Sequence, residues 1–408
     1  MVDRVFIHIG LPKTATTYLQ SIFWSAKDDL RAGGVALPGN GHGDHRWASR
    51  IVRDYEGLDK RPQAQRSAWK RVRNELRRNS GTGLISHELL ASASVEQAQR
   101  MVAELPTDDV HVVVTAREPL GLFTASWQET VKIGSTTPLS EYSPTASEDP
   151  SDTWNWRTLD LGLVLQRWAQ AVPPERIHVL VLDPKAPRDD VWHRFAGIIG
   201  FDSSAVEVEA PMENSSLGVA EVETLRRVNQ DLQGPWSGLD RGSILRRYLA
   251  EQRLVPRKGE RFWPEPEQVE DARRRGEDTV AHLKSAAYDI SGDLENLRVP
   301  LDLPDRRLTS SVTDSEVAQV ATALAAEMLA DIRALRRGKD PTRGNADRGK
   351  GSKRGRGKPR GKPGRAKRQA AAAPEVSAPR RAARRVLDRL PDERRRQVVR
   401  VARRLRGS

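Results

Sequence analysis

The sequence VFIHIGLPKTATT, residues 5–17, decides the fold, because an apolar run leads straight into a short loop and then into helical spacing. Val5–Ile9 predicts a buried strand, and Thr16–Lys27 predicts the helix that follows the loop. The apolar run is too short for the core of a signal peptide, and no run approaches the ~18–20 apolar residues that span a bilayer. We therefore expect a cytoplasmic protein that begins with a strand, a loop and a helix.

The loop Gly10–Thr17 has the chemistry of a phosphate-binding site. A loop that feeds a helix N-terminus presents unpaired backbone N–H groups and the positive end of the helix dipole. Lys13 adds a positive charge, and Thr14, Thr16 and Thr17 add hydroxyl groups. The order differs from a Walker A loop, in which Lys follows Gly and directly precedes Ser or Thr. The alternative is a plain turn whose threonines cap the helix.

Short apolar runs alternate with helical stretches through the first half of the chain, which is typical of an α/β fold with a largely parallel sheet. Further strands are expected at Gly83–Ser86, Val110–Thr115 and Ile177–Leu182. From about residue 219 the pattern is mostly helical. The expected helices after the first are residues 69–78, 95–103, 120–132, 159–171, 189–200, 221–233, 244–254, 267–285 and 314–336. Residues 136–157, rich in Pro, Ser and Thr, predict a long functional loop with Trp154 and Trp156 alternating as on a strand.

The loop resembles the 5′-phosphosulfate loop of sulfotransferases that use 3′-phosphoadenosine 5′-phosphosulfate (PAPS), usually Pro-Lys-Ser/Thr-Gly-Thr-Thr, and above all that of bacterial sulfotransferase-like proteins. The resemblance implies a P-loop-type three-layer fold with a central, mostly parallel sheet, and PAPS as the sulfuryl donor. It implies donor contacts from Lys13, Thr14, Ala15, Thr16 and Thr17, with Lys13 also catalytic. Ala15 stands where Gly is usual; its backbone N–H is kept, so binding is expected to survive on the condition that Ala15 has a negative φ.

A second segment supports the resemblance. Arg117 ends the strand at Val110–Thr115, and in the family an Arg here and a Ser eight residues later bind the 3′-phosphate. A guanidinium can bind a phosphate bidentately. Eight residues on is Ala125, with Thr124 and Ser126 on either side, so we expect one of these hydroxyls to substitute; Ser126 lies about 100° further round the helix. The resemblance covers roughly residues 3–330.

The acceptor's proton needs a base, and the resemblance places one after the second strand of the prediction, at His87-Glu88. Glu88 is the first choice by similarity to sulfotransferases that act on sugars, and His87 is the alternative. Both also fit a structural role, with Glu88 opening a helix and His87 packed beneath it. His42 and His45 have metal-like spacing without further ligands nearby, so we expect a flexible surface loop there and no metal site.

Charge is unevenly spread along the 408 residues. Residues 336–408 hold 27 basic and 6 acidic residues, a net of +21, and the remainder is mildly acidic. The absence of Cys excludes disulfides, thiolate metal sites and cysteine nucleophiles. We expect a sulfotransferase-like domain over residues 1–336, a disordered Lys/Arg/Gly/Pro-rich linker over 337–380 and a basic amphipathic helical end over 381–408. Such a tail favours nucleic acid, anionic lipid or another polyanion, or simply aids solubility.

The sequence thus favours an enzyme that moves a sulfuryl group from PAPS to a hydroxyl or amine of a small molecule or carbohydrate, without a metal. Two alternatives remain at this stage: an inactive sulfotransferase-like binding protein tethered by its tail, and a P-loop kinase. The early Lys13 and the lack of an obvious Mg²⁺-holding acid speak against the kinase.

Overall fold

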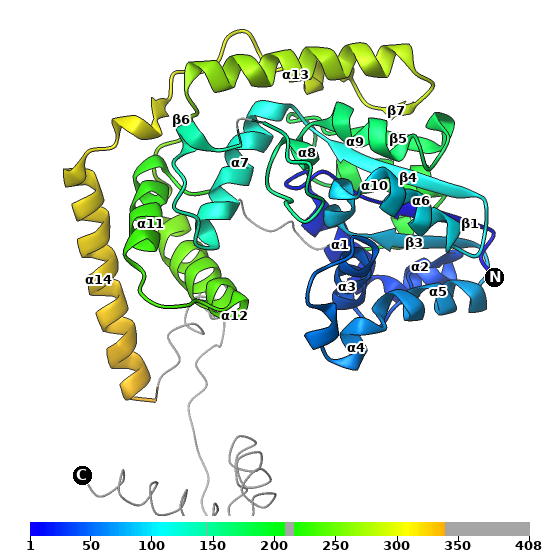
Figure 1. The fold of residues 1–408 in the computed structure, drawn as a ribbon, viewed down its shortest axis with the longest axis horizontal. Coiled ribbons are helices and arrows are strands. Elements are labelled where there is room, and N and C mark those ends of the chain that lie inside the picture. Colours follow the sequence, from blue (N-terminus) through cyan, green and yellow to red (C-terminus); the bar gives the residue numbers. More distant parts are fainter. Residues whose placement is uncertain (144, 209–215, 339–408) are drawn as a thin grey trace, which may run out of the picture. The chain divides into compact units, whose positions relative to one another are not determined.

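The computed structural model describes residues 1–143, 145–208 and 216–338. Within them, a parallel sheet has the strand order β2-β3-β1-β4-β5-β7 (Figure 1). Its strands are β2 (Val35–Ala36), β3 (Thr82–Ser86), β1 (Arg4–His8), β4 (Val110–Ala116), β5 (Ile177–Val181) and β7 (Asp289–Ser291). The α/β prediction is confirmed, and the four predicted strands lie within one residue of their expected ends. The edge strands β2 and β7 were not predicted, since runs of two and three residues carry little periodic signal.

Alternate residues of each strand enter different cores, as the pleat of a strand requires. Phe6, Leu84 and Val113 lie in one apolar cluster. It is covered by α1 (Thr16–Ser25), α2 (Lys27–Ala32) and α10 (Asp190–Ile199), the last of which ends at Gly200 in the left-handed region. These helices form one layer against this face of the sheet.

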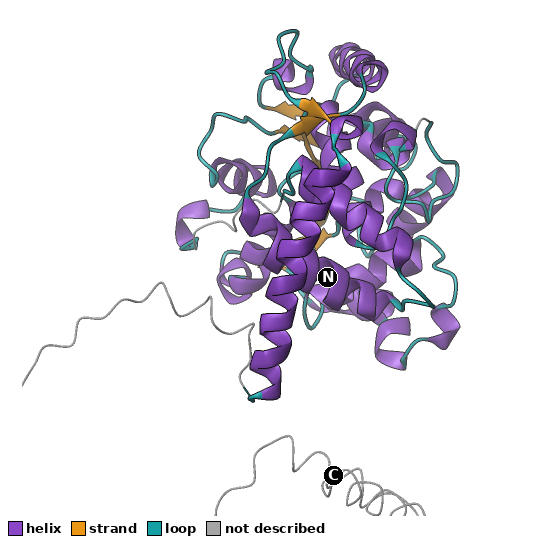
Figure 2. Cartoon of the chain, turned by 90° about the vertical axis from the view of Figure 1, so that its left-hand side faces the viewer, coloured by secondary structure: helices purple, strands orange, loops and turns teal. Residues whose placement is uncertain are grey.

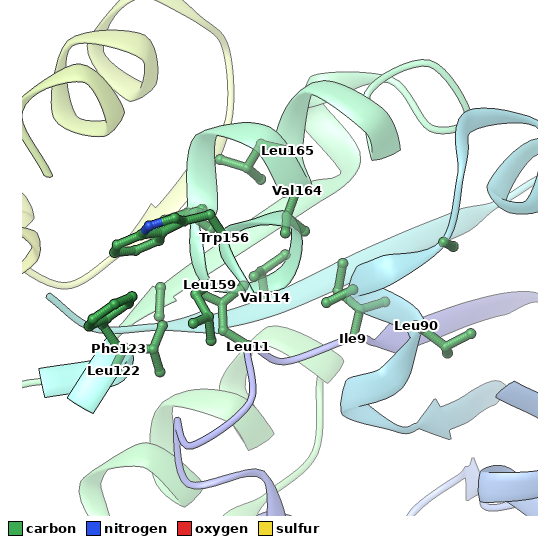
Figure 3. Packing of buried hydrophobic residues seen from close by; sticks show 14 of the residues in the cluster. Ile9, Leu11, Leu90, Val114, Leu122, Phe123, Trp156, Leu159, Val164 and Leu165 are labelled. Atoms are coloured by element: carbon green, nitrogen blue, oxygen red, sulfur yellow. The ribbon is translucent and has the colours of Figure 1, made fainter. Parts of the chain in front are cut away.

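The opposite face is covered by α5 (Ala68–Arg78), α6 (Val95–Ala103), α7 (Pro119–Lys132) and α9 (Leu161–Trp168). Figure 3 shows how Ile9 and Val114 of the sheet region lie against side chains of α7, α8 (Trp156–Leu159) and α9. Sheet residues therefore pack on both faces, which gives the three-layer fold expected from the sequence.

The later part of the described chain is helical, as predicted. It comprises α11 (Val219–Asp231), the short α12 (Gly238–Asp240), the helical segment η6 (Arg241–Leu254), α13 (Pro266–Ser285) and α14 (Asp314–Arg336). Figure 2 shows this part from its outer side, with α14 in front. Val222, Leu245 and Leu324 belong to the same apolar core as α7 and α9, so the helical part shares one core with the sheet. A small ladder pairs β6 (Phe262–Trp263) with β8 (Arg307–Leu308).

Two local predictions were wrong. His42 and His45 lie on α3 (His42–Val52) rather than in a flexible loop, because Trp47 and Val52 of this segment are buried in the core. α4 (Gln63–Arg66) follows it along the chain. Trp156 is not on a strand: it opens α8, stacks on Phe123 at 4.9 Å between ring centroids, and lies under the guanidinium of Arg275.

The chain divides into a compact unit, Met1–Pro341, and the segment Thr342–Ser408. Apart from residues 337 and 338, the predicted linker and the helical end lie outside the described residues. Within the described ranges, no helix is both long and apolar enough to cross a bilayer.

Candidate active site

The residues selected from the sequence gather where neighbouring strands β3, β1 and β4 end. The His87 N–H donates to the His8 carbonyl at 3.0 Å, and the Leu11 N–H donates to the Thr115 carbonyl at 2.9 Å. A Cβ at Gly10 would lie 3.6 Å from Cβ of Glu88, which places the loop and Glu88 side by side. The carboxyl edge of a parallel sheet is where α/β proteins bind ligands.

In the loop, residues with positive φ alternate with a residue that lacks it. Gly10, Lys13 and Ala15 have φ values of 52°, 67° and 62°, whereas Thr14 between the last two lies outside the positive-φ region. Alternation of right- and left-handed residues turns successive N–H groups toward one point, a nest that binds anions. The condition of a negative φ at Ala15 is therefore not met. The residue keeps its N–H in the nest, but its methyl group makes the left-handed conformation costly.

The threonine hydroxyls are not equivalent. The Thr14 hydroxyl is buried and donates to the Leu11 carbonyl at 2.6 Å, and it lies 2.7 Å from the Thr115 hydroxyl, which therefore donates to it. Thr16 is buried against Gly10, and Thr17 is exposed. Thr14 thus uses its hydroxyl for contacts within the loop and with β4.

His8 continues this support beneath the loop. The Thr115 hydroxyl uses its proton toward Thr14, so it accepts from Nε2 of His8 at 3.3 Å. Nδ1 of His8 then accepts from the Ser86 hydroxyl at 2.8 Å. Burial lowers the pKa of His8 to about 4, against a smaller opposing effect of Glu88. The neutral imidazole of His8, on β1, therefore connects the neighbouring strands β3 and β4. The sequence analysis did not identify this residue.

The Lys13 side chain contacts a carboxylate outside the loop. Its Nζ lies 3.0 Å from Oε1 of Glu129 on α7, and the same oxygen lies 3.0 Å from Nζ of Lys132. Arg246 of η6 contacts the other oxygen at 3.1 Å. Burial alone would raise the pKa of Glu129, but Lys132, Lys13 and Arg246 hold it at about 2. Neither Glu129 nor Arg246 was predicted as a site residue.

His87 and Glu88 differ sharply in accessibility. His87 is buried, and its Nδ1 accepts from the Leu89 N–H at 3.2 Å, so the ring proton sits on Nε2. The Glu88 side chain is 26% exposed, and its Oε2 accepts from Nε2 of Gln20 at 3.1 Å. Burial opposes the charge of Glu88, yet His87, its own backbone N–H and Gln20 lower the pKa of the carboxyl overall. Glu88 is therefore ionised at neutral pH and able to accept a proton, whereas His87 has its acceptor nitrogen engaged.

The two histidines on α3 have defined partners. His42 Nε2 lies 2.8 Å from Oε1 of Gln20, so His42 connects to Glu88 through that amide. His45 Nε2 donates to the Pro38 carbonyl at 2.8 Å, and its Nδ1 accepts from the Ser86 N–H at 3.2 Å. In the part of the chain that the structure describes, no cluster of three or more His, Asp or Glu residues is arranged to hold a metal.

Arg117 and Ser126 are not brought together. The Arg117 guanidinium contacts Glu118 at 3.1 Å, lies over Gly121 and remains 37% exposed, so it is accessible to a phosphate. The Ser126 hydroxyl is fully buried, 2.7 Å from the Tyr142 hydroxyl. The Thr124 hydroxyl donates to the Leu120 carbonyl within its own helix. A buried Ser126 cannot replace the missing serine, and we do not carry it into the proposed site.

Comparison with known proteins adds little. No family model matches the chain, and no curated protein matches it. A crystal structure of a sulfotransferase from Alicyclobacillus acidocaldarius aligns with a TM-score of 0.32 and 15% identity, over 51% of this chain and 85% of that chain. A likeness this slight carries no argument about function. The chain is a three-layer α/β protein with a parallel sheet, and its own site is the basis for the function proposed below.

Proposed function

We propose that the protein is a sulfotransferase that uses PAPS to sulfate a hydroxyl or amine. The observation that carries this proposal is the loop Gly10–Thr17 after β1, whose left-handed Lys13 and Ala15 are typical of anion-binding nests and which lies beside Glu88. Backbone strain is retained where function needs it, and Lys13 and Ala15 are both held in the left-handed region here. The loop motif that resembles the phosphosulfate loop of this family supplies the choice of donor.

The residues at the site fit such a donor. The nest N–H groups suit a 5′-phosphate, and the exposed guanidinium of Arg117, after the neighbouring strand β4, suits a second phosphate. PAPS would supply the sulfuryl group, whose bond to the bridging phosphate oxygen breaks as the acceptor atom bonds to sulfur. Lys13 and the loop N–H groups would stabilise the charge that develops on that phosphate oxygen.

Glu88 is the residue that we propose as general base. It is ionised, partly exposed and adjacent to the loop, so it can take the acceptor's proton as the acceptor bonds to sulfur. Gln20 fixes one of its oxygens and leaves the other for the acceptor. His87 instead caps the short helix η2 (Glu88–Ser92) through its contact with the Leu89 N–H.

The decisive experiment measures transfer of labelled sulfate from PAPS into a mixed pool of acceptors, together with calorimetric binding of PAP, the desulfated product. We expect wild-type protein to bind PAP, and Lys13→Ala to reduce transfer by at least about 100-fold, as loss of one charge-stabilising donor does elsewhere. Lys70→Ala, at an exposed position on α5, is the matched control and should leave transfer unchanged. Folded wild-type protein that fails to bind PAP would refute the proposal.

A further inference from the structure

Glu129 is a buried carboxylate with one negative charge, and three cationic side chains contact it. Its side chain is 3% exposed and contacts the amines of Lys13 and Lys132 and the guanidinium of Arg246. Removing one partner from a buried ion pair is costly because it leaves an uncompensated charge. Here two cations remain when any one leaves, so Glu129 can release a partner at a smaller cost.

Lys13 is the partner placed to leave. Its side chain is 29% exposed and belongs to the strained loop, whereas Lys132 is buried on the same helix as Glu129. Arg246 is 46% exposed, but it comes from η6 and also contacts Glu251 at 3.1 Å. Lys13 therefore lies between two negative groups, the carboxylate that it contacts in this structure and the phosphate that the nest would hold.

We propose that Glu129 is a positioning residue that holds Lys13 away from the donor site in the empty enzyme, and that Arg246 sets how tightly it does so. The inference rests on the proposed function. When the donor's phosphosulfate enters the nest, Lys13 exchanges Glu129 for it, while Arg246 and Lys132 continue to compensate the buried carboxylate. Donor affinity then depends on the competition between the two anions for one lysine.

This competition predicts opposite effects for two neighbouring substitutions. Glu129→Gln keeps the shape of the side chain but removes the competing charge, so PAP should bind about 5- to 10-fold more tightly. Arg246→Gln removes a cation that shares Glu129, so the grip on Lys13 strengthens and PAP should bind several-fold more weakly. A role in stability alone would move both variants in the same direction.

The double variant Glu129→Gln/Arg246→Gln separates direct from indirect action of Arg246. If Arg246 acts through Glu129, the double variant should bind PAP as tightly as Glu129→Gln alone. Glu251→Gln, which removes the other partner of Arg246, is the matched control and should change PAP affinity less than twofold. Calorimetry on the full chain, with circular dichroism to confirm folding, measures all four proteins.

The outcomes are distinguishable. Wild-type protein without PAP affinity overturns the proposed function and this inference with it. Wild-type binding combined with weaker binding in both single variants overturns the inference alone. A loss in Arg246→Gln that persists in the double variant also overturns it, because Arg246 would then bind the donor itself. If Glu129→Gln does not fold, Arg246→Gln is measured with and without Lys13→Ala: a loss of PAP affinity that disappears when Lys13 is absent supports the competition, and no loss, or a loss that persists, refutes it.

Discussion

The two ends of the parallel sheet use polar residues in different ways. At the amino end, Asp109, His111, His178 and Asp289 form a chain across β4, β5 and β7, with contacts of 3.1, 2.9 and 2.6 Å. At the carboxyl end, Lys13 and Ala15 hold a strained backbone, and Glu129 is surrounded by cations. The first arrangement links side chains in pairs along ordinary strands. The arrangement at the carboxyl end combines a strained backbone with more cationic than anionic side chains around Glu129. Such an arrangement is useful only to a ligand or a reaction.

The contrast shows how a site can be distinguished from a structural cluster without a bound ligand. Histidines and aspartates are abundant at the amino end, yet their partners are one another. The carboxyl end instead has a loop with left-handed residues, an accessible lysine and a partly exposed carboxylate. Composition alone would not separate the two ends.

The largest effect that tests this comparison concerns activity. Glu88→Gln should reduce sulfuryl transfer by about 10²- to 10⁴-fold with PAP affinity nearly unchanged, because the base acts on the acceptor's proton and not on the nucleotide. His111→Gln, at the amino end, should leave transfer within about twofold. The measurement is initial-rate transfer from labelled PAPS, alongside PAP calorimetry for each variant. Wild-type turnover in Glu88→Gln would show that Glu88 is not the general base.

Much of the fold could be predicted because its signals are local. Four strands and the helices α6 and α14 follow from apolar periodicity, and α6 and α14 begin and end where expected. Lys13 was found in the loop between a strand and a helix, and the resemblance pointed to Glu88 and Arg117 after two further strands; the structure places the ends of these neighbouring parallel strands at one edge. Position relative to a strand is thus the part of a site that sequence conveys.

The rest of the site depends on contacts between distant residues. Arg246 reaches Glu129 across 117 positions, and His8 contacts Thr115 across 107, so no local pattern signals either contact. One signal was present: Glu129 and Lys132, at i and i+3 beside the apolar Trp127, indicate an ion pair on a buried helix face. The φ of Ala15 was also hidden, because alanine gives no warning of a left-handed conformation.

An intermediate effect should appear in the dependence of stability on pH. Burial lowers the pKa of His8, His45 and His87 to about 4 at the carboxyl end. Because these folded-state pKa values lie below the ordinary value of about 6.5, the stabilisation is complete above pH 6.5 and is lost as pH falls toward 4. Each histidine should contribute up to about 1.4 kcal/mol of unfolding free energy per pH unit in that window.

Urea unfolding of wild-type protein and His45→Gln at pH 7.5, 6.0 and 5.0 measures that contribution. The variant should be less stable at pH 7.5, and the difference should shrink as pH falls, because only the wild type must take up the extra proton on unfolding. His111→Gln should change the slope less, since burial lowers the pKa of His111 but Asp109 acts against it. Equal slopes for wild-type and His45→Gln proteins would contradict a buried neutral His45.

The smallest effect tests the strain in the loop directly. Ala15 is in the left-handed region at φ 62°, where a methyl group costs about 1–2 kcal/mol, part of which glycine would recover against its greater freedom in the unfolded chain. Ala15→Gly should therefore raise the free energy of unfolding by about 0.5–1 kcal/mol. Ala32→Gly, at an exposed helical position on α2, should lower it by up to about 1 kcal/mol. Urea denaturation of both variants gives the two signs.

Since the Ala15 N–H is unchanged, PAP affinity should stay within about twofold. Loss of stability in Ala15→Gly comparable to that in Ala32→Gly would mean that the loop is relaxed, and the difference between the two ends of the sheet would then rest on charge alone.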